Sequence, residues 1–326
     1  MIPTILTFLA SLGILAVASR FVISSCIRIA EYFKISELAV GYLMIAMATS
    51  VPDFMVSTTA SYKGVSGMAL GDALGSSIAN ICLVLGIAAV MRTIRVKREQ
   101  ALEGAELLLL VSIIPLILLT RNVIGAIEGA VLLVIFLFYA LFAVKEKFTL
   151  GLKEGVKHSE WMRQMAIFIV SIGVTLYSAQ FIVGSGVEIA SMLGVDAALI
   201  GMTMVAFGTT LPELAIDFTA IRKGHFSLAI GDILGSCVVN LTLVLGASAL
   251  INPLTDGAMF IQISIAFLVG AVVFLWYILM KHEGIKKEHG LIFLIAYILF
   301  IMIQFVWGVT THSGGAVAAA AGAGVP

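Results

Sequence analysis

The chain has 326 residues, of which 61% are hydrophobic and only 12% charged, with a mean hydropathy of +1.13. Soluble domains carry about 25% charged residues, so this composition excludes a soluble fold and predicts an all-α polytopic membrane protein. The 19 basic residues balance the 19 acidic residues, which removes the excess of positive charge that binding to nucleic acid requires.

Ten apolar stretches follow one another along the chain, separated by charged, glycine or proline residues. A bilayer core about 30 Å thick takes roughly 20 apolar residues of helix, so each stretch predicts one transmembrane helix. The stretches are 3–30, 37–62, 67–91, 102–120, 123–144, 162–191, 197–221, 226–251, 257–280 and 289–309. They predict a first five-helix repeat in residues 1–144, a linker in 145–160, a second five-helix repeat in 161–309 and a flexible, Gly/Ala-rich tail in 310–326.

The basic residues of the loops indicate how the chain is oriented. If successive loops lie on alternate sides of the membrane, Lys63 and Arg121 are nearly alone on one side, and most other lysines and arginines lie on the other. The positive-inside rule makes the lysine- and arginine-rich side cytoplasmic. We therefore expect a multi-pass plasma membrane protein with both termini outside and the central linker in the cytoplasm.

The two sets of five stretches are copies of one sequence. Phe21–Gly86 aligns without a gap with Phe181–Gly246, and more than a third of the positions are identical. Because each half has an odd number of spans, the second copy enters the membrane in the opposite orientation. Such inverted repeats are typical of secondary transporters, whose binding site lies at the bilayer midplane between the copies.

Two polar segments of the repeat lie inside predicted spans, where lipid excludes unpaired polar groups. The first segment is Ala46–Asp53 in the first half and Ala206–Glu213 in the second. The second segment is Gly71–Asn80 in the first half and Gly231–Asn240 in the second.

A proline interrupts the first polar segment of each half. Pro52 and Pro212 have no N–H for the carbonyls of Ala48 and Gly208, so we expect the helix to kink there and to free those carbonyls. Beside each break, a threonine and a carboxylate lie four residues apart on one helix face. These pairs are Thr49 with Asp53, and Thr209 with Glu213.

Carboxylic acids lie in predicted spans that hold no lysine or arginine near them: Asp53, Asp72, Glu213, Asp217 and Asp232. Left charged in lipid, each costs roughly 2.5–3.5 kcal/mol, so the acids must be protonated, hydrated in a cavity or paired with bound cations. The donor set is carboxylate, hydroxyl, amide and carbonyl oxygen without thiolate or imidazole, which suits a hard cation such as Ca²⁺. The sequence therefore predicts an oxygen-lined cation site between the halves.

Each of these features also has a structural interpretation. The glycines of the second segment match a motif for close helix packing, and serine and threonine hydroxyls in membrane helices often bond to their own backbone carbonyls. Asp72 and Asp232 can face a water-filled vestibule at a helix entrance. Asp217 has Ser57 at the matching place in the first half, so the repeat does not support a role for it.

The duplicated segments resemble the two α-repeats of the cation/Ca²⁺ exchanger superfamily, particularly its prokaryotic sodium/calcium exchanger branch. The resemblance rests on Ala48-Thr-Ser-Val-Pro-Asp53 with Gly208-Thr-Thr-Leu-Pro-Glu213, and on Gly71-Asp-Ala-Leu-Gly-Ser76 with Gly231-Asp-Ile-Leu-Gly-Ser236. It implies ten spans as two inverted five-helix repeats, with Asp53 and Glu213 as the central Ca²⁺ and Na⁺ ligands. It also implies supporting metal ligands, namely Thr49, Ser50, Ser76, Thr209, Thr210 and Ser236, the carbonyls of Ala46 and Ala206, and the amides of Asn80 and Asn240.

The chain departs from the family pattern in ways that bear on ion choice. Ala48 replaces a usual glycine, and Asp53 replaces a usual glutamate, which shortens that ligand by one methylene. Asn240 stands where potassium-dependent relatives carry aspartate, which argues against K⁺ coupling. Asp72 and Asp232 replace a usually neutral residue and add acids that can bind protons or a second cation, so we include both among the candidate metal ligands.

We therefore expect a secondary-active antiporter that exchanges Na⁺ for Ca²⁺ through this site, with Ca²⁺/H⁺ exchange by the same site as the alternative. A cation channel built on the same residues is a further alternative. Ala69–Asp72 approaches the Gly-x-Gly-Asp pattern of an intramembrane aspartyl protease, but that chemistry needs one close acid pair, whereas here the polar segments are duplicated. We expect no enzyme activity and no cofactor; the partners are the transported cations and the lipid bilayer, and the oligomeric state stays open.

Overall fold

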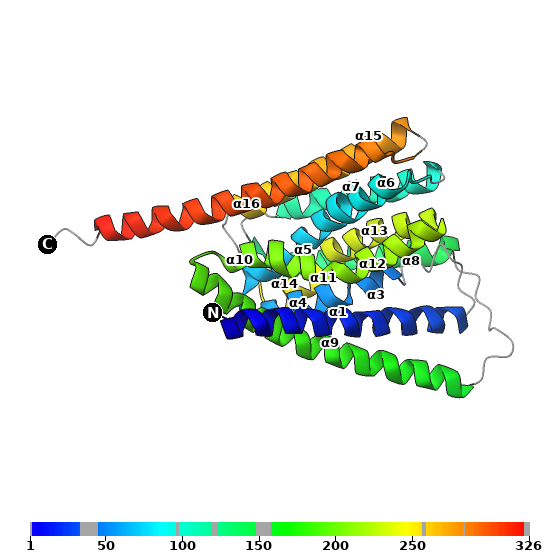
Figure 1. Ribbon diagram of the computed structural model, residues 1–326, viewed down its shortest axis with the longest axis horizontal. Helices are drawn as coiled ribbons and strands as arrows, with labels where there is room; N and C mark the ends of the chain where they lie inside the picture. The colour runs from blue at the N-terminus through cyan, green and yellow to red at the C-terminus, as the bar shows by residue number, and fades with distance from the viewer. Residues whose placement is uncertain are drawn as a thin grey trace.

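The structure is a computed structural model that describes residues 2–32, 45–95, 98–118, 123–147, 158–255, 259–282 and 284–322. Its helices run lengthwise beside one another in a bundle (Figure 1). The first half contains α1 (Ile2–Tyr32), α3 (Ala46–Thr49), α4 (Val51–Tyr62), α5 (Ser66–Ile78), the π-helical turn η2 (Ala79–Val84), α6 (Leu85–Met91), α7 (Arg98–Leu118), β1 (Val123–Ile124) and α8 (Ala126–Lys147). The second half contains α9 (His158–Leu193), α10 (Ala197–Ile200), the π-helical turn η4 (Gly201–Val205), α11 (Ala206–Thr209), α12 (Leu211–Lys223), α13 (Phe226–Val239), the π-helical turn η5 (Asn240–Val244), α14 (Leu245–Ile251), β2 (Leu254–Thr255), α15 (Met259–Lys281) and α16 (Lys287–Gly322).

Six helical runs in the described part of the chain are long and apolar enough to cross a membrane, and α10 to α12 form a seventh, broken span. The six are Ile2–Val22, Ser66–Met91, Trp161–Leu193, Phe226–Ile251, Ile261–Lys281 and Lys287–Val306. They confirm the helices predicted at these places.

The predicted count of ten spans is not reached by length and hydropathy alone. The described apolar part of α8 is only Ala126–Leu141, and α7 begins with the charged residues Arg98, Glu99 and Glu103. Residues 37–44 of the predicted span 37–62 lie outside the described residues.

Large apolar side chains cover the outer faces of α1, α8, α9 and α16. Ile2, Ile127 and Phe138 expose 72%, 79% and 69% of their surface. The interior holds buried carboxylic acids while the exterior is apolar, whereas in a soluble protein acidic side chains lie mostly on the surface. Together with the apolar spans, this distribution identifies a multi-pass integral membrane protein.

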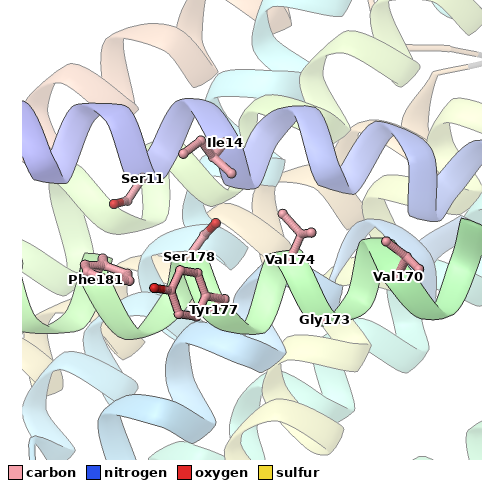
Figure 2. Close-up of a pocket in the computed structure, with 8 residues that line it drawn as sticks. All are labelled: Ser11, Ile14, Val170, Gly173, Val174, Tyr177, Ser178 and Phe181. Atoms are coloured by element: carbon pink, nitrogen blue, oxygen red, sulfur yellow. The ribbon is translucent and has the colours of Figure 1, made fainter.

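Helices α1 and α9 lie side by side along the edge of the bundle and run in opposite directions (Figure 1). An open groove runs along their seam (Figure 2). It is lined by Ser11, Ile14, Val170, Gly173, Val174, Tyr177, Ser178 and Phe181. Because this lining contains no carboxylate, lysine, arginine or histidine and Val170 and Tyr177 are largely exposed, the groove belongs to the outer apolar surface and not to the predicted cation site.

The two halves exchange their last helices. Helix α16 of the second half packs on η2 and α6 of the first, while α8 of the first half packs on η5 and α14 of the second. Short backbone pairings repeat this exchange, since β1 pairs with β2 and Ile94 exchanges two hydrogen bonds of 2.9 Å with Ile285. Neither half therefore completes its own packing.

Glycines make this exchange of helices possible. Gly86 faces Gly290, and Gly129 faces Gly246, so that a Cβ at any of the four would lie 2.7–3.2 Å from the carbonyl oxygen of the facing glycine. Small residues allow such close approach of helix backbones in membranes.

The predicted close packing at the glycines of α5 is confirmed. A Cβ at Gly71 would clash with the carbonyl oxygen of Ala198, and one at Gly75 would clash with that of Met202. Because α5 belongs to the first half and α10 and η4 to the second, these glycines fix how closely the two halves meet beside the polar segments.

Helix α16 continues through residues 310–322, where the composition predicted a flexible tail. The end of α16 projects beyond the rest of the bundle (Figure 1). Alanine is the best helix former, and the run of alanines from Ala318 to Ala321 favours a helix at this end.

Candidate cation site

Two broken helices place a threonine and a carboxylate inside the bundle. Helix α3 gives way to α4 at Ser50, and α11 gives way to α12 at Thr210, where ψ is 3° and −8°. Pro52 and Pro212 lie in the first turn of the new helix, where a missing N–H costs little. The segment before Thr210 and the segment after it are bent by 41°, so the predicted kink is confirmed there.

The carbonyls of Ala48 and Gly208 are not free, contrary to our expectation. Each accepts a backbone N–H at the end of its short helix. The turn at the cap tightens the chain, which satisfies carbonyls that the proline cannot reach.

The candidate carbonyls of Ala46 and Ala206 are also engaged. The carbonyl oxygen of Ala46 accepts from the Ser50 N–H at 3.0 Å and from the Thr49 hydroxyl at 3.2 Å. The carbonyl oxygen of Ala206 accepts from the Thr210 N–H at 3.0 Å and from the Thr210 hydroxyl at 2.7 Å. A cation that uses either oxygen must displace or share these donors.

All the predicted ligands are buried, and none exposes more than 2% of its surface. They are Ala46, Thr49, Ser50, Asp53, Asp72, Ser76, Asn80, Ala206, Thr209, Thr210, Glu213, Asp232, Ser236 and Asn240. Asp72 and Asp232 therefore do not face an open vestibule.

Hydrogen bonds between hydroxyls and carboxylates join the two halves in a symmetric pattern. Thr49 Oγ1 lies 3.0 Å from Ser236 Oγ and donates to Asp232 Oδ1 at 3.1 Å. Thr209 Oγ1, at the matching place, lies 3.3 Å from Ser76 Oγ and donates to Asp72 Oδ1 at 3.3 Å. Each threonine thus contacts the serine and the acid of the other half.

The two central carboxylates differ in their hydrogen bonds. Asp53 accepts from Ser76 Oγ at 2.7 Å and from Asn240 Nδ2 at 3.3 Å. Neither oxygen of Glu213 has a hydrogen-bond donor, and the amide of Asn80, which matches Asn240, has no partner either. Helix α12, which carries Glu213, packs on η2, which carries Asn80. Glu213 thus has an amide on a neighbouring helix, as Asp53 has in Asn240, but no hydrogen bond joins Glu213 to it.

The charge of the site is uncompensated. Asp53, Asp217 and Asp232 act electrostatically on Glu213, and every lysine and arginine whose exposure the structure describes is exposed. Ionised carboxylates that meet in a dry interior repel each other, so this arrangement needs bound cations or protons.

Among the described residues, no three acidic, histidine or cysteine side chains lie close enough to hold one metal ion. A cation bound here would therefore take one or two carboxylates and complete its shell with hydroxyl, amide and carbonyl oxygens. Hard cations accept such a shell.

Asp217 is the acid that the repeat did not support. It is fully buried, and its carboxyl interacts with that of Asp232. The spacing was a usable signal, because Asp217 follows Glu213 by four residues and so shares its helix face.

The hydroxyls at Ser50 and Thr210, which match in the repeat, differ in their hydrogen bonds. Ser50 Oγ has no partner, whereas the Thr210 hydroxyl donates to the Ala206 carbonyl one turn earlier, as the structural interpretation expects.

Comparison with known proteins gives matches over nearly the whole chain. A family model described as sodium/calcium exchanger protein matches residues 3–145 and again residues 163–306, so one sequence unit occurs in both halves. The putative antiporter CaxA of Alkalimonas amylolytica is 32% identical over 317 residues, which cover 94% of this chain and 99% of CaxA.

Two sodium/calcium exchangers are also similar. MaX1 of Methanosarcina acetivorans is 23% identical over 92% of this chain and 98% of its own. Among solved structures, the sodium-calcium exchanger NCX_Mj soaked with Na⁺ and Sr²⁺ matches with a TM-score of 0.69 and 29% identity, covering 92% of this chain and 97% of that chain.

Proposed function

Because the chain belongs to the sodium/calcium exchanger protein family, in the prokaryotic branch of the cation/Ca²⁺ exchanger superfamily, we propose that it is an antiporter that exchanges Na⁺ for Ca²⁺. The family is one of transporters and not of enzymes, and the cations are its substrates. The observation that carries the proposal is the burial of Asp53 and Glu213 beside two broken helices, where no lysine or arginine of the described residues is buried with them.

The charge of the two carboxylates matches one Ca²⁺ ion. The oxygens around them supply the rest of the 6–8 ligands that Ca²⁺ takes. We propose as these ligands the hydroxyls of Thr49, Ser50, Ser76, Thr209, Thr210 and Ser236, the amides of Asn80 and Asn240, and the carbonyls of Ala46 and Ala206. Asp72 and Asp232 hold the threonines and extend the site. Na⁺ and Ca²⁺ then exclude each other because both need the same carboxylates.

The proposed membrane topology has ten spans as two inverted repeats, with both termini outside and residues 145–160 as the cytoplasmic linker. It is supported by the start of α1 and the end of α16, which lie at the same end of the bundle, opposite the start of α9 (Figure 1). The antiparallel α1 and α9 pack on each other, and α9 also contacts α4. We propose that these two helices move against the remaining bundle to expose the site to either side, as inverted-repeat transporters do.

A gradient exchange tests this function. Proteoliposomes with the purified chain are loaded with Na⁺ and diluted into Na⁺-free buffer that contains radiolabelled Ca²⁺. We expect Ca²⁺ uptake that requires the Na⁺ gradient and is absent when K⁺ replaces Na⁺ inside. Absence of uptake under the Na⁺ gradient, in vesicles that hold folded protein, would refute Na⁺/Ca²⁺ exchange.

Ca²⁺/H⁺ exchange is the second candidate, favoured by the buried acids Asp72, Asp217 and Asp232 beyond the two central carboxylates. The same vesicles with an acidic interior and no Na⁺ distinguish the two. Uptake driven only by the pH gradient identifies H⁺ as the coupling ion. Ca²⁺ flux that runs without either countertransported ion identifies a channel.

Ser76→Ala is expected to weaken Ca²⁺ binding about 10–100-fold, the usual loss when a residue that orients a metal ligand is removed. The Ser76 hydroxyl holds Asp53 Oδ1 at 2.7 Å. Ser77→Ala is the matched control, because the neighbouring Ser77 hydroxyl donates to the Ala73 carbonyl of its own helix. Calorimetric titration of both variants with Ca²⁺ measures the difference, and equal affinities would remove Ser76 from the site.

A further inference from the structure

The second half contains a pair of carboxyl groups that the first half lacks. In the first half, Ser57 Oγ donates to Asp72 Oδ2 at 2.7 Å. At the matching place in the second half, α12, which carries Asp217, packs on α13, which carries Asp232, and the two carboxyl groups interact. Two acceptors therefore meet where the first half joins a donor to an acceptor.

Three of the four carboxyl oxygens of this pair are buried and without hydrogen-bond donors. Asp217 and Asp232 expose none of their surface, and both Asp217 oxygens and Asp232 Oδ2 have no hydrogen-bond partner. Ionised carboxylates can only accept hydrogen bonds, so neither acid can satisfy the other. A positive species between them is required.

The number of unpaired oxygens favours a metal cation over a proton. One proton joins a single oxygen of each carboxyl, which leaves an Asp217 oxygen bare, whereas a cation contacts several oxygens at once. Ca²⁺ takes 6–8 oxygens, but only three are free here, because Asp232 Oδ1 already accepts from Thr49 and Ser236. Three oxygens fall short of the shell that Ca²⁺ takes, so we assign the pair to Na⁺, the other cation of the proposed exchange.

We propose that Asp217 and Asp232 form an accessory Na⁺ site in the second half of the protein. The inference rests on the proposed Na⁺/Ca²⁺ exchange and adds a residue and a bound ion to it. No equivalent site arises in the first half, because Ser57 supplies a hydroxyl hydrogen where Asp217 supplies a charge.

The accessory site lies next to the central one. Glu213 precedes Asp217 by one turn of α12, both of its oxygens are unpaired, and Asp217 and Asp232 act on it electrostatically. Na⁺ bound at the pair makes the electrostatic potential around Glu213 less negative and so weakens the attraction of Ca²⁺ to the central site. Occupation of the accessory site therefore promotes release of Ca²⁺.

Direct binding of radiolabelled Na⁺ to the purified full-length chain, without Ca²⁺, tests the proposal. We expect Asp217→Ser, which copies the first half, to bind one Na⁺ fewer per chain than the unaltered protein. Asp217→Glu keeps the charge and should retain the ion. Glu103→Gln, which removes an exposed acid of α7, is the control for loss of charge elsewhere and should bind the full number. In vesicles, the dependence of Ca²⁺ uptake on Na⁺ concentration should become less steep in Asp217→Ser.

An unchanged number of bound Na⁺ ions in Asp217→Ser would overturn the accessory site. So would a change confined to the pH dependence of transport at constant Na⁺ binding, because that result assigns a proton to the pair. Size-exclusion chromatography verifies folding, and Asp217→Asn replaces Asp217→Ser if the latter aggregates. Failure of the proposed function gives a different result, since the unaltered protein then shows no Na⁺-driven Ca²⁺ uptake whatever the Na⁺ binding of the variants.

Discussion

Glu213→Gln and Asp53→Asn are each expected to abolish Na⁺-driven Ca²⁺ uptake. Either change removes one of the two central carboxylates whose charge balances the divalent cation. Loss of one partner of a buried charge pair costs about 3–5 kcal/mol, which is roughly a hundred-fold or more in affinity. The measurement is uptake of radiolabelled Ca²⁺ into Na⁺-loaded proteoliposomes, with Glu103→Gln as the exposed control.

The two variants should differ in stability without Ca²⁺. Glu213 has no hydrogen-bond donor, so Glu213→Gln removes an uncompensated charge and should raise the melting temperature of the ion-free protein. Asp53 accepts from Ser76 and Asn240, so Asp53→Asn should not give this gain. Thermal unfolding in detergent, with and without Ca²⁺, reports both effects. Normal transport by both variants would show that the central ligands are wrongly assigned.

Gly75→Val is expected to prevent the halves from packing. Even a Cβ at this position would clash with the Met202 carbonyl oxygen and would lie 2.8 Å from the Ala206 Cβ. Overpacking a core usually costs about 1–3 kcal/mol, and more when backbone must move. Because Ala206 lies in the broken helix of the site, we expect loss of transport together with a lower melting temperature.

The control for this change is Gly173→Val, at the groove between α1 and α9 (Figure 2). No atom lies within 4 Å of a Cβ at Gly173, so a side chain there starts in open space, and we expect the melting temperature to be unchanged. Equal stability and transport of Gly75→Val and Gly173→Val would contradict the close approach of α5 and η4.

Much of the fold was predictable because the chain repeats itself and lipid enforces long apolar helices. The breaks at Pro52 and Pro212 followed from the missing N–H, and the clash at Gly75 followed from the glycine motif. The exchange of α8 and α16 between the halves was not predictable, since sequence spacing shows which helix faces carry small residues but not which helix packs on each face. The carbonyls of Ala48 and Gly208 were wrongly expected to be free because the tightening of the chain at a cap depends on local dihedral angles.

The sequence predicted which polar residues lie buried inside the bundle but not which hydrogen bonds they form. Repetition identified the acids and hydroxyls, but each threonine proved to reach the acid of the opposite half. Repetition gave no support for a role of Asp217, because its match in the first half is a serine. The difference between Asp53, which has donors, and Glu213, which has none, depends on side-chain positions that no spacing encodes.

The exchange of helices between the halves also sets an order for biogenesis. Membrane chains are made from the N-terminus, so α8 enters the bilayer before α14 exists, and α6 remains without α16 until almost all of the protein has been synthesised. Gly86 and Gly129 present bare backbone to lipid during this interval. The nascent first half is thus an open intermediate that only the final helix closes, and a ribosome that stops before α16 leaves a product suited to degradation rather than to transport.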